Sequence, residues 1–251
     1  MLLSIQSNIT TLSWIMALTA TFVVGVSKAG IKGIAVVSVT LMALAFGAKE
    51  STGLVVPLLI LADIFAVFYY NRHTQWNYII RFLPWILVGI LVGVFIGMDL
   101  DEDTFKIGMA IIILGSVAMM YWWDHKKSKE VPTHWTFAGL IGILAGITTM
   151  IGNLAGAFSN IFFLAMRLPK NEFIGTAAWL FLIINLFKLP FHIWSWKTIT
   201  PETLWVDLKL APAIFLGLFV GVRLVKIIKE DFYRKMIMIL TAIGAILILV
   251  K

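Results

Sequence analysis

The chain has 251 residues, of which 61% are hydrophobic and only 13% are charged, and its mean hydropathy is +0.97. A soluble domain carries about 25% charged residues, so half that share, together with long apolar runs, predicts a protein that lies in a lipid bilayer. The absence of cysteine excludes disulfides, thiolate metal sites and thiol catalysis. The net charge of +7 comes from basic residues in the loops between apolar runs, which is typical of membrane topology and argues against a nucleic-acid partner.

Ten apolar segments, joined by short connections, account for most of the chain. Several have only 15 to 18 residues, which is near or below the roughly 20 that a straight membrane span requires. The segments have the approximate bounds 9–26, 30–47, 52–70, 80–98, 104–123, 134–151, 154–168, 172–194, 208–224 and 232–250. The start of the chain lacks the basic region and cleavage site of a signal peptide, so we expect it to be retained in one transmembrane domain, residues 1–251.

Two pairs of short segments, the first with the second and the sixth with the seventh, are interrupted by glycines. Glycine permits a sharp turn, so each pair is either two short full spans or one broken or re-entrant hairpin whose turn lies inside the membrane. The sequence therefore predicts eight to ten membrane helices. The interrupting glycines are Gly25, Gly30 and Gly33 in the first pair and Gly146, Gly152 and Gly156 in the second.

The second half of the chain resembles the first. The run PWILVGILVGVFIG, from Pro84, aligns with PAIFLGLFVGVRLV, from Pro212, at an offset of 128 residues, and Gly30 falls on Gly152 at an offset of 122. Polar residues in the same register are harder to attribute to chance than glycine and leucine are. At the offset of 128, Glu102 and Asp103 fall on Glu230 and Asp231, Phe105 on Tyr233, and Lys106 on Arg234. The sequence predicts two repeats, residues 1–125 and 132–251.

Each predicted repeat crosses the membrane an odd number of times, so the second repeat enters from the opposite side, as in many secondary transporters. The expected fold is an all-α membrane protein with two inverted-topology repeats and broken or re-entrant helices near Gly25–Gly33 and Gly146–Gly156. The positive-inside rule places the more basic side in the cytoplasm and both termini outside, for a multi-pass protein of the plasma (inner) membrane. That side carries Arg72, Arg81, Lys126, Lys127, Lys129, Arg167, Lys170, Arg223, Lys226, Lys229, Arg234 and Lys235, and the other carries Lys49, Lys106, Lys197, Lys209 and Lys251.

The first break, GVSKAGIKG, combines three glycines with two lysines. A helix that starts just after such a turn points its free N–H groups and its positive end at the break. With the Ser27 hydroxyl and the Lys28 ammonium group beside it, this break favours an anion-binding site. The alternative is an ordinary interfacial loop whose lysines face headgroups or water.

The second break, GITTMIGNLAG, carries threonines and an asparagine where the first carries lysines. These side chains can donate hydrogen bonds to a solute oxygen, or they can satisfy backbone groups that a broken helix leaves unpaired in lipid. The alternative is close helix packing through small residues. The candidate donors here are Thr148, Thr149 and Asn153.

Two charged residues lie well inside apolar segments. A charge near the bilayer centre costs at least about 2.5–3.5 kcal/mol, so Asp63 and Lys188 indicate a functional role. Asn185 is the counterpart of Asp63 at the offset of 122, and Lys188 lies about one turn further. Either Asp63 and Lys188 form an ion pair, or Asp63 carries a proton for coupling while Lys188 attracts an anion. A proton relay and a structural role both remain open for His192.

Catalytic and cofactor motifs are missing from the sequence. We find no HExxH, Walker A, GxSxG or dinucleotide-binding pattern and no cluster of metal ligands, and we expect neither cofactor nor metal. Aromatic residues that flank the segments predict belts at the membrane–water interfaces. They are Tyr69, Tyr70, Trp76, Trp85, Trp122, Trp123, Trp135, Trp194 and Trp196.

Over nearly its whole length the chain resembles the TauE/SafE family of sulfite exporters. The resemblance rests on the length, the repeated halves, the breaks GVSKAGIKG and MIGNLAG, and the proline-led third segment with Asp63. Many members have denser glycine runs followed by a proline, where this chain has lysines and no proline. The resemblance implies two inverted halves around a central site, with Ser27, Lys28, Gly30 and Lys32 on one side and Thr148, Thr149, Gly152 and Asn153 on the other.

The expected function is secondary transport of a small anion such as sulfite, a sulfonate or an organic acid, with export implied by the resemblance. Lys28 and the helix ends would neutralise the anion, and Asp63 would be the best candidate for coupling its movement to protons. A membrane-embedded enzyme would require a convergent set of nucleophile, base or metal ligands, and none is evident. A structural membrane subunit would not require charges in mid-span. The expected partners are the small anionic solute and membrane lipid, and the fold also allows a homodimer.

Overall fold

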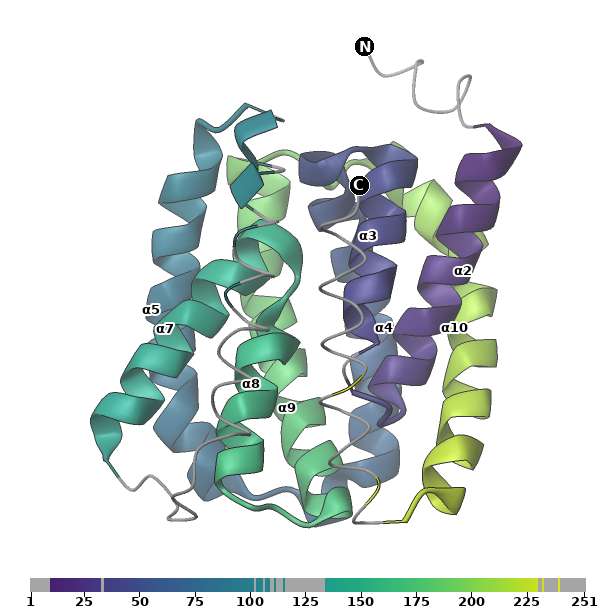
Figure 1. Cartoon of the computed structure of the whole chain (residues 1–251). Helices are drawn as coiled ribbons and strands as arrows, with labels where there is room; N and C mark the ends of the chain where they lie inside the picture. Colours follow the sequence, from purple (N-terminus) through teal and green to yellow (C-terminus); the bar gives the residue numbers. More distant parts are fainter. Residues whose placement is uncertain are drawn as a thin grey trace.

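The computed structural model is helical throughout the part of the chain that it describes (Figure 1). This part comprises residues 10–32, 34–101, 103–105, 107–108, 111, 115, 134–229, 232 and 239. The predicted segments 104–123 and 232–250 lie almost entirely outside it. So do six of the residues that support the predicted repeat, namely Glu102, Lys106, Glu230, Asp231, Tyr233 and Arg234.

Eight α-helices follow one another in the described residues. In the first half they are α2 (Thr11–Lys28), α3 (Ala35–Phe46), α4 (Ala48–Tyr70), which continues as the 3₁₀ turn Asn71–His73, and α5 (Trp76–Met98). In the second half they are α7 (Trp135–Gly152), α8 (Ala155–Ala165), α9 (Lys170–Pro190), which continues as the π-helical turn Phe191–Ser195, and α10 (Pro201–Ile227). Six of them, α2, α4, α5, α7, α9 and α10, are long and apolar enough to cross a membrane, so the predicted multi-pass helical protein is confirmed.

Helix α10 begins seven residues before the apolar segment predicted at 208–224. Its start is determined by capping at Thr200. The Thr200 side chain accepts a hydrogen bond from the Thr203 N–H, and the Thr203 side chain accepts one from the Thr200 N–H. Pro201 occupies the first helical position, where its missing N–H costs nothing. A hydropathy average cannot locate such a start, because the first turns of α10 contain polar residues.

Both predicted breaks are places where one helix stops and a shorter one starts. Helix α2 ends at Lys28 and is followed by Gly30, whose φ of 129° is unfavourable for any residue with a side chain. Helix α7 ends at Gly152, and Asn153 adopts the left-handed conformation with a φ of 56°. The helices that follow, α3 and α8, have 12 and 11 residues. Each is therefore about 17–18 Å long, well short of the ~30 Å hydrocarbon core.

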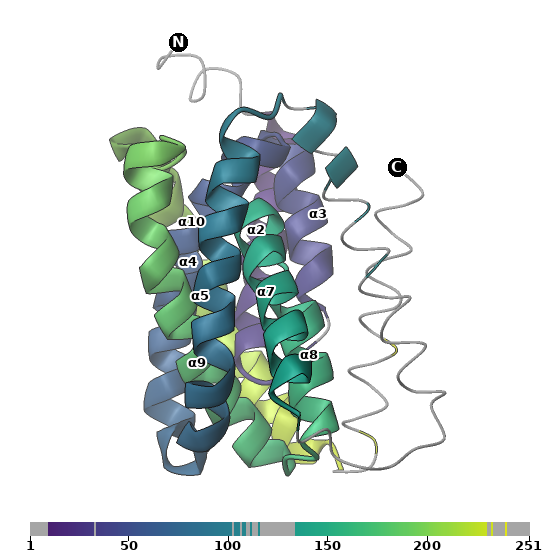
Figure 2. The same cartoon turned by 90° about the vertical axis from the view of Figure 1, so that its left-hand side faces the viewer.

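The arrangement of the breaks brings the starts of the two short helices to similar heights. In Figure 1, α2 descends from the upper right and α3 returns to the top, whereas α7 rises from the lower left and α8 returns to the bottom. Figure 2 shows α3 and α8 on the same side of the molecule, α3 in its upper half and α8 in its lower half. The N-terminal ends of both short helices consequently point toward the middle of the bundle.

Close helix contacts form through glycine. Helix α2 packs on α10, α7 packs on α5, and α4 packs on α9. In the α2–α10 contact Gly25 lies against Gly217, and in the α7–α5 contact Gly146 lies against Gly89. A Cβ atom on Gly25 or on Gly146 would overlap with the backbone of the facing helix. Gly217 and Gly89 are the residues that the sequence alignment superimposes at the offset of 128. Small residues of this kind let membrane helices approach until their backbones touch.

Candidate functional site

A cavity of about 60 Å³ lies where the two breaks meet. We refer to it as the central cavity. Both breaks contribute to its wall, together with α4, α8 and α9. Half of the ten predicted site residues line it, namely Ser27, Lys28, Lys32, Thr149 and Asn153.

The N-terminal ends of α3 and α8 form another part of the wall. Ala35 and Val36 of the first turn of α3 line the cavity, and so do Ala155 and Gly156 of the first turn of α8. Neither helix start has a hydrogen bond from a capping side chain. The first N–H groups of a helix have no partner within the helix, and they carry its positive dipole end. The cavity therefore combines two helix ends that favour an anion.

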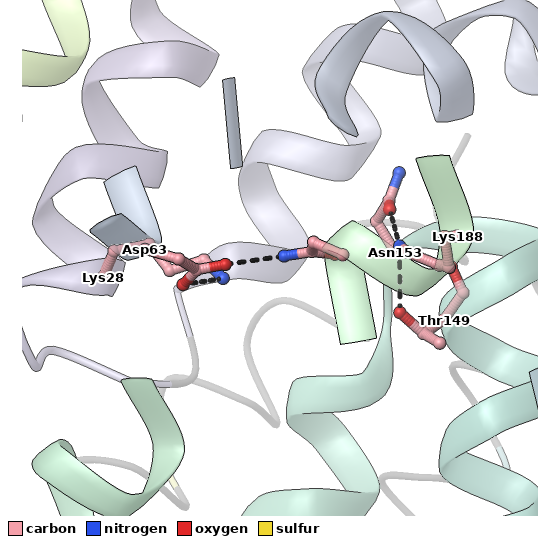
Figure 3. Close-up of polar contacts among 6 residues, drawn as sticks. Lys28, Asp63, Thr149, Asn153 and Lys188 are labelled. Atoms are coloured by element: carbon pink, nitrogen blue, oxygen red, sulfur yellow. Dashed lines mark hydrogen bonds and ion pairs between the residues drawn. The ribbon is translucent and has the colours of Figure 1, made fainter. Parts of the chain in front are cut away.

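Lys28 and Asp63 form a buried ion pair behind the cavity wall (Figure 3). Lys28 Nζ lies 2.7 Å from Asp63 Oδ1, and the Asn185 amide donates a hydrogen bond of 2.6 Å to Asp63 Oδ2. Lys28 and Asn185 line the cavity, whereas Asp63 does not. The alternative in which Asp63 pairs with Lys188 is wrong, because α2 brings Lys28 to this carboxylate instead.

Lys188 holds the second break in its conformation. Its ammonium group donates to the Thr149 carbonyl oxygen at 3.2 Å, to Thr149 Oγ1 at 3.1 Å and to Asn153 Oδ1 at 2.6 Å (Figure 3). These bonds use all three of its donors. The Asn153 amide in turn donates to the Thr52 carbonyl oxygen of α4 at 2.9 Å. Lys188 is fully buried and does not line the cavity, so its charge acts through Thr149 and Asn153 and through the local electric field.

Lys32 differs from the other two buried lysines. It is only 4% exposed and lines the cavity, where its ammonium group lies 5.5 Å from the ring centre of Phe181. Its ammonium group has no hydrogen-bond or ion-pair partner among the residues that the structure describes. Lys28 approaches the same ring to 4.7 Å. An incoming anion would meet an ammonium group here whose donors are not used by any of the described residues.

The other predicted site residues lie close to the cavity but outside its wall. Gly30 packs against Ile174, the Thr148 hydroxyl donates to the Ala145 carbonyl oxygen in its own helix, and Gly152 is the last residue of α7. Their positions are consistent with a role in shaping the breaks rather than in contacting a solute.

Asn160 and Phe181 are among the cavity-lining residues that sequence reasoning missed. Asn160 is 2% exposed, and its Oδ1 atom has no hydrogen-bond partner in the described structure. Phe181 forms the aromatic face beneath Lys28 and Lys32. A polar amide within the apolar segment 154–168 was the available signal for Asn160, whereas no pattern distinguishes Phe181 from the other aromatic residues of α9.

The sequence model of the sulfite exporter TauE/SafE family matches residues 17–248, which is nearly the whole chain. The chain belongs to the TauE/SafE family. Comparisons with curated proteins and with solved structures gave no match. The family is one of membrane transporters for sulfite-like anions and not of enzymes, so the resemblance and the expected exclusion of an enzyme are both confirmed.

Two aromatic residues of this TauE/SafE protein were wrongly predicted to lie in an interfacial belt. Tyr70 and Trp196 are only 6% and 8% exposed. Each uses its polar atom within the bundle: the Tyr70 hydroxyl donates to the Ala29 carbonyl oxygen at 2.9 Å, and the Trp196 indole donates to the Val94 carbonyl oxygen at 3.2 Å. Buried aromatic side chains with a polar group require such a partner. Trp122 and Trp123 lie outside the described residues.

His192 is also buried. Its Nδ1 atom lies 2.9 Å from Thr198 Oγ1, and its Nε2 atom has no hydrogen-bond partner in the described structure. It does not line the central cavity. Across the described part of this TauE/SafE protein, no group of three or more acidic or histidine side chains is placed to hold a metal ion.

Proposed function

We propose that this protein is a secondary transporter of the plasma (inner) membrane that moves sulfite, a sulfonate or a related small organic acid by alternating access. The observation that carries the proposal is the central cavity, which is lined by Lys28, Lys32 and the uncapped starts of α3 and α8, and by no carboxylate of the described residues. Charge-assisted hydrogen bonds from ammonium and backbone N–H groups suit the oxygens of such an anion.

We further propose that residues 1–125 and 132–251 are inverted repeats and that the two breaks are re-entrant. Three observations support this. Helices α2 and α7 run in opposite directions (Figure 1), the glycine contacts of α2 with α10 recur between α7 and α5, and Asp63 touches its repeat counterpart Asn185 where α4 packs on α9. A site between inverted repeats can be opened to either side by rocking one set of helices against the other.

The three buried lysines have different roles in this proposal. Lys32 is the direct ligand of the anion because its donors are unused in the described structure. Lys28 is shared between Asp63 and the anion, so protonation of Asp63 would release Lys28 toward the cavity and link anion binding to proton movement. Lys188 positions Thr149 and Asn153 and adds positive potential from behind.

The orientation follows from the basic residues. The more basic side, which includes the end of α10, faces the cytoplasm and both termini lie outside. A reporter fused to the C-terminus should be active only outside the cytoplasm, and activity in the cytoplasm would overturn the orientation without affecting the proposed transport.

Transport is tested by reconstituting the protein in liposomes and following uptake of radiolabelled sulfite, with sulfonates, thiosulfate and carboxylates as competitors. Lys32→Gln should raise the KM for the transported anion by about 10- to 100-fold, because one charge-assisted hydrogen bond contributes about 1.5–3 kcal/mol. Lys209→Gln is the matched control, since Lys209 is an exposed lysine that packs on Trp14 and does not line the cavity.

The anion specificity is tested separately by thermal shift of the purified protein. A transported anion should stabilise the protein in a dose-dependent manner, because a ligand that binds only the folded state adds RT ln(1 + [L]/Kd) to its stability. Normal transport by Lys32→Gln would refute the assigned site. Absence of both transport and stabilisation with every anion would refute the proposed function and favour a structural role.

A further inference from the structure

A second hollow, of about 340 Å³, lies at one end of the bundle. The end of α4 with its 3₁₀ turn, the start of α9 and the end of α10 surround it, and these ends lie at the bottom of Figure 1. We refer to it as the lower hollow. It opens on the side where the sequence concentrates basic residues. Its lining includes Tyr69, Tyr70, His73, Lys170, Asn171 and Lys226.

The lining of the lower hollow is cationic and aromatic. Lys226 and His73 are exposed, and the Lys226 ammonium group lies 5.9 Å from the ring centre of Tyr69. Lys170 donates to the carbonyl oxygens of Val225 at 3.3 Å and Ile228 at 2.7 Å, which places a second lysine charge at the negative end of α10. No Asp or Glu in the described part of the chain lines this hollow. Its chemistry therefore favours an anion with several oxygens.

The lower hollow is separated from the first break by a thin layer of protein. Tyr70 lines the hollow, and its hydroxyl donates to the carbonyl oxygen of Ala29. Ala29 directly follows Lys28, which lines the central cavity. Val225, which also lines the hollow, lies close to Gly30. The hollow and the central cavity thus both adjoin the first break, and the Tyr70–Ala29 hydrogen bond joins the lining of the hollow to it.

We propose that the lower hollow binds an oxyanion through Lys226, with His73, Asn171 and the Tyr69 hydroxyl group as further donors. The bound group is either the free anionic solute or the phosphate of an anionic lipid headgroup, since the same donors suit both. A basic pocket between membrane helices on the cytoplasmic side is a recurrent site for anionic headgroups. Binding itself is independent of the proposed transport. A further role for the hollow rests on the proposed function: it would hold the solute before the Tyr70–Ala29 contact opens toward the central cavity.

The experiment compares Lys226→Gln with the control Lys229→Gln. Lys229 is also exposed and close to the end of α10, but it does not line the hollow. Both changes are made in full-length protein that also carries Lys32→Gln, so that binding in the central cavity is weakened. One arm measures binding of sulfite and of inorganic phosphate to delipidated protein by calorimetry. The other arm measures, by native mass spectrometry, retention of phosphatidylglycerol from vesicles of phosphatidylcholine with one quarter phosphatidylglycerol.

We expect Lys226→Gln to weaken binding by about five- to tenfold in at least one arm, and Lys229→Gln to leave both arms unchanged. A loss confined to phosphatidylglycerol identifies the ligand as a lipid headgroup, and a loss confined to sulfite or phosphate identifies it as the free anion. Equal losses in the two variants, or no loss in either arm for Lys226→Gln, would overturn the site. None of these results depends on transport, so failure of the proposed function would be recognised separately by the absence of anion transport and of thermal stabilisation in the wild-type protein.

Discussion

The substitution Asp63→Asn removes the negative charge that faces Lys28 but keeps an oxygen that can accept the hydrogen bond from Asn185. It therefore perturbs the ion pair with little change in shape. We expect two consequences: the free energy of unfolding falls because a buried ammonium group loses its partner, and transport becomes independent of the proton gradient because the candidate coupling group is gone. The first can be given a magnitude from the geometry.

Opposite unit charges 2.7 Å apart attract each other by about 6 kcal/mol at an effective dielectric constant of about 20. Much of this is offset by the cost of taking both charges out of water, but removal of one partner leaves the other unpaired and costs about 3–5 kcal/mol. We therefore expect Asp63→Asn to destabilise the protein by about 3 kcal/mol. Lys28→Met in the same chain removes the unpaired charge, so the double variant should recover about 2 kcal/mol of that loss.

The assay is equilibrium unfolding in mixed detergent micelles, followed by tryptophan fluorescence, for the wild type, both single variants and the double variant. Glu50→Gln is the matched control, since Glu50 is an exposed acid near the start of the same helix. The cycle isolates the coupling between the two side chains. If the single effects simply add up in the double variant, Lys28 and Asp63 are not coupled, and the reasoning about the pair is wrong.

Two further predictions concern the breaks and the helix contacts, both read by the same unfolding assay. Gly146→Ala should destabilise the protein by about 1–3 kcal/mol, because the added methyl group would overlap with the Ile86 carbonyl oxygen. The control is Gly139→Ala on the same helix, whose methyl group would meet only ordinary contacts and which should be neutral or slightly stabilising. Equal effects of the two substitutions on the free energy of unfolding would contradict the α5–α7 packing. Asn153→Gly keeps a residue suited to the left-handed turn but removes the acceptor of the short bond from Lys188, so we expect a loss of about 1.5–3 kcal/mol, and unchanged stability would show that this bond is not needed.

The existence of most helices could be predicted from hydropathy, but their ends could not. The segments expected at 134–151 and 172–194 closely match α7 and α9, because a long apolar run in lipid has few alternatives to a helix. The start of α10 was placed seven residues too late, because the Thr200 cap and not hydropathy determines it. The predicted inverted repeat remains a proposal, and many of the polar residues on which it rested lie outside the described residues.

The candidate site could be predicted as a set of residues but not as a set of contacts. Ser27, Lys28 and Lys32 were singled out because lysines and glycines interrupt an apolar run, and all three line the cavity. The partner of Asp63 could not be predicted, because Lys28 and Lys188 both lie at a plausible depth. Their depth follows from position along the helix, whereas the partner depends on which helix face meets which.

By itself, the sequence determined that this protein is a polytopic helical membrane protein of the TauE/SafE family with two polar breaks. These properties depend on composition and order along one chain, and a lipid environment turns them directly into helices. Only the tertiary structure decided that α2 supplies the partner of Asp63, that Lys188 supports the second break, and that Tyr70 faces inward to hold Ala29. Those contacts depend on how helices far apart in sequence are rotated about their axes and how closely they approach each other. The backbone contacts at Gly25 and Gly146 restrict the rotation and the distance of their helices.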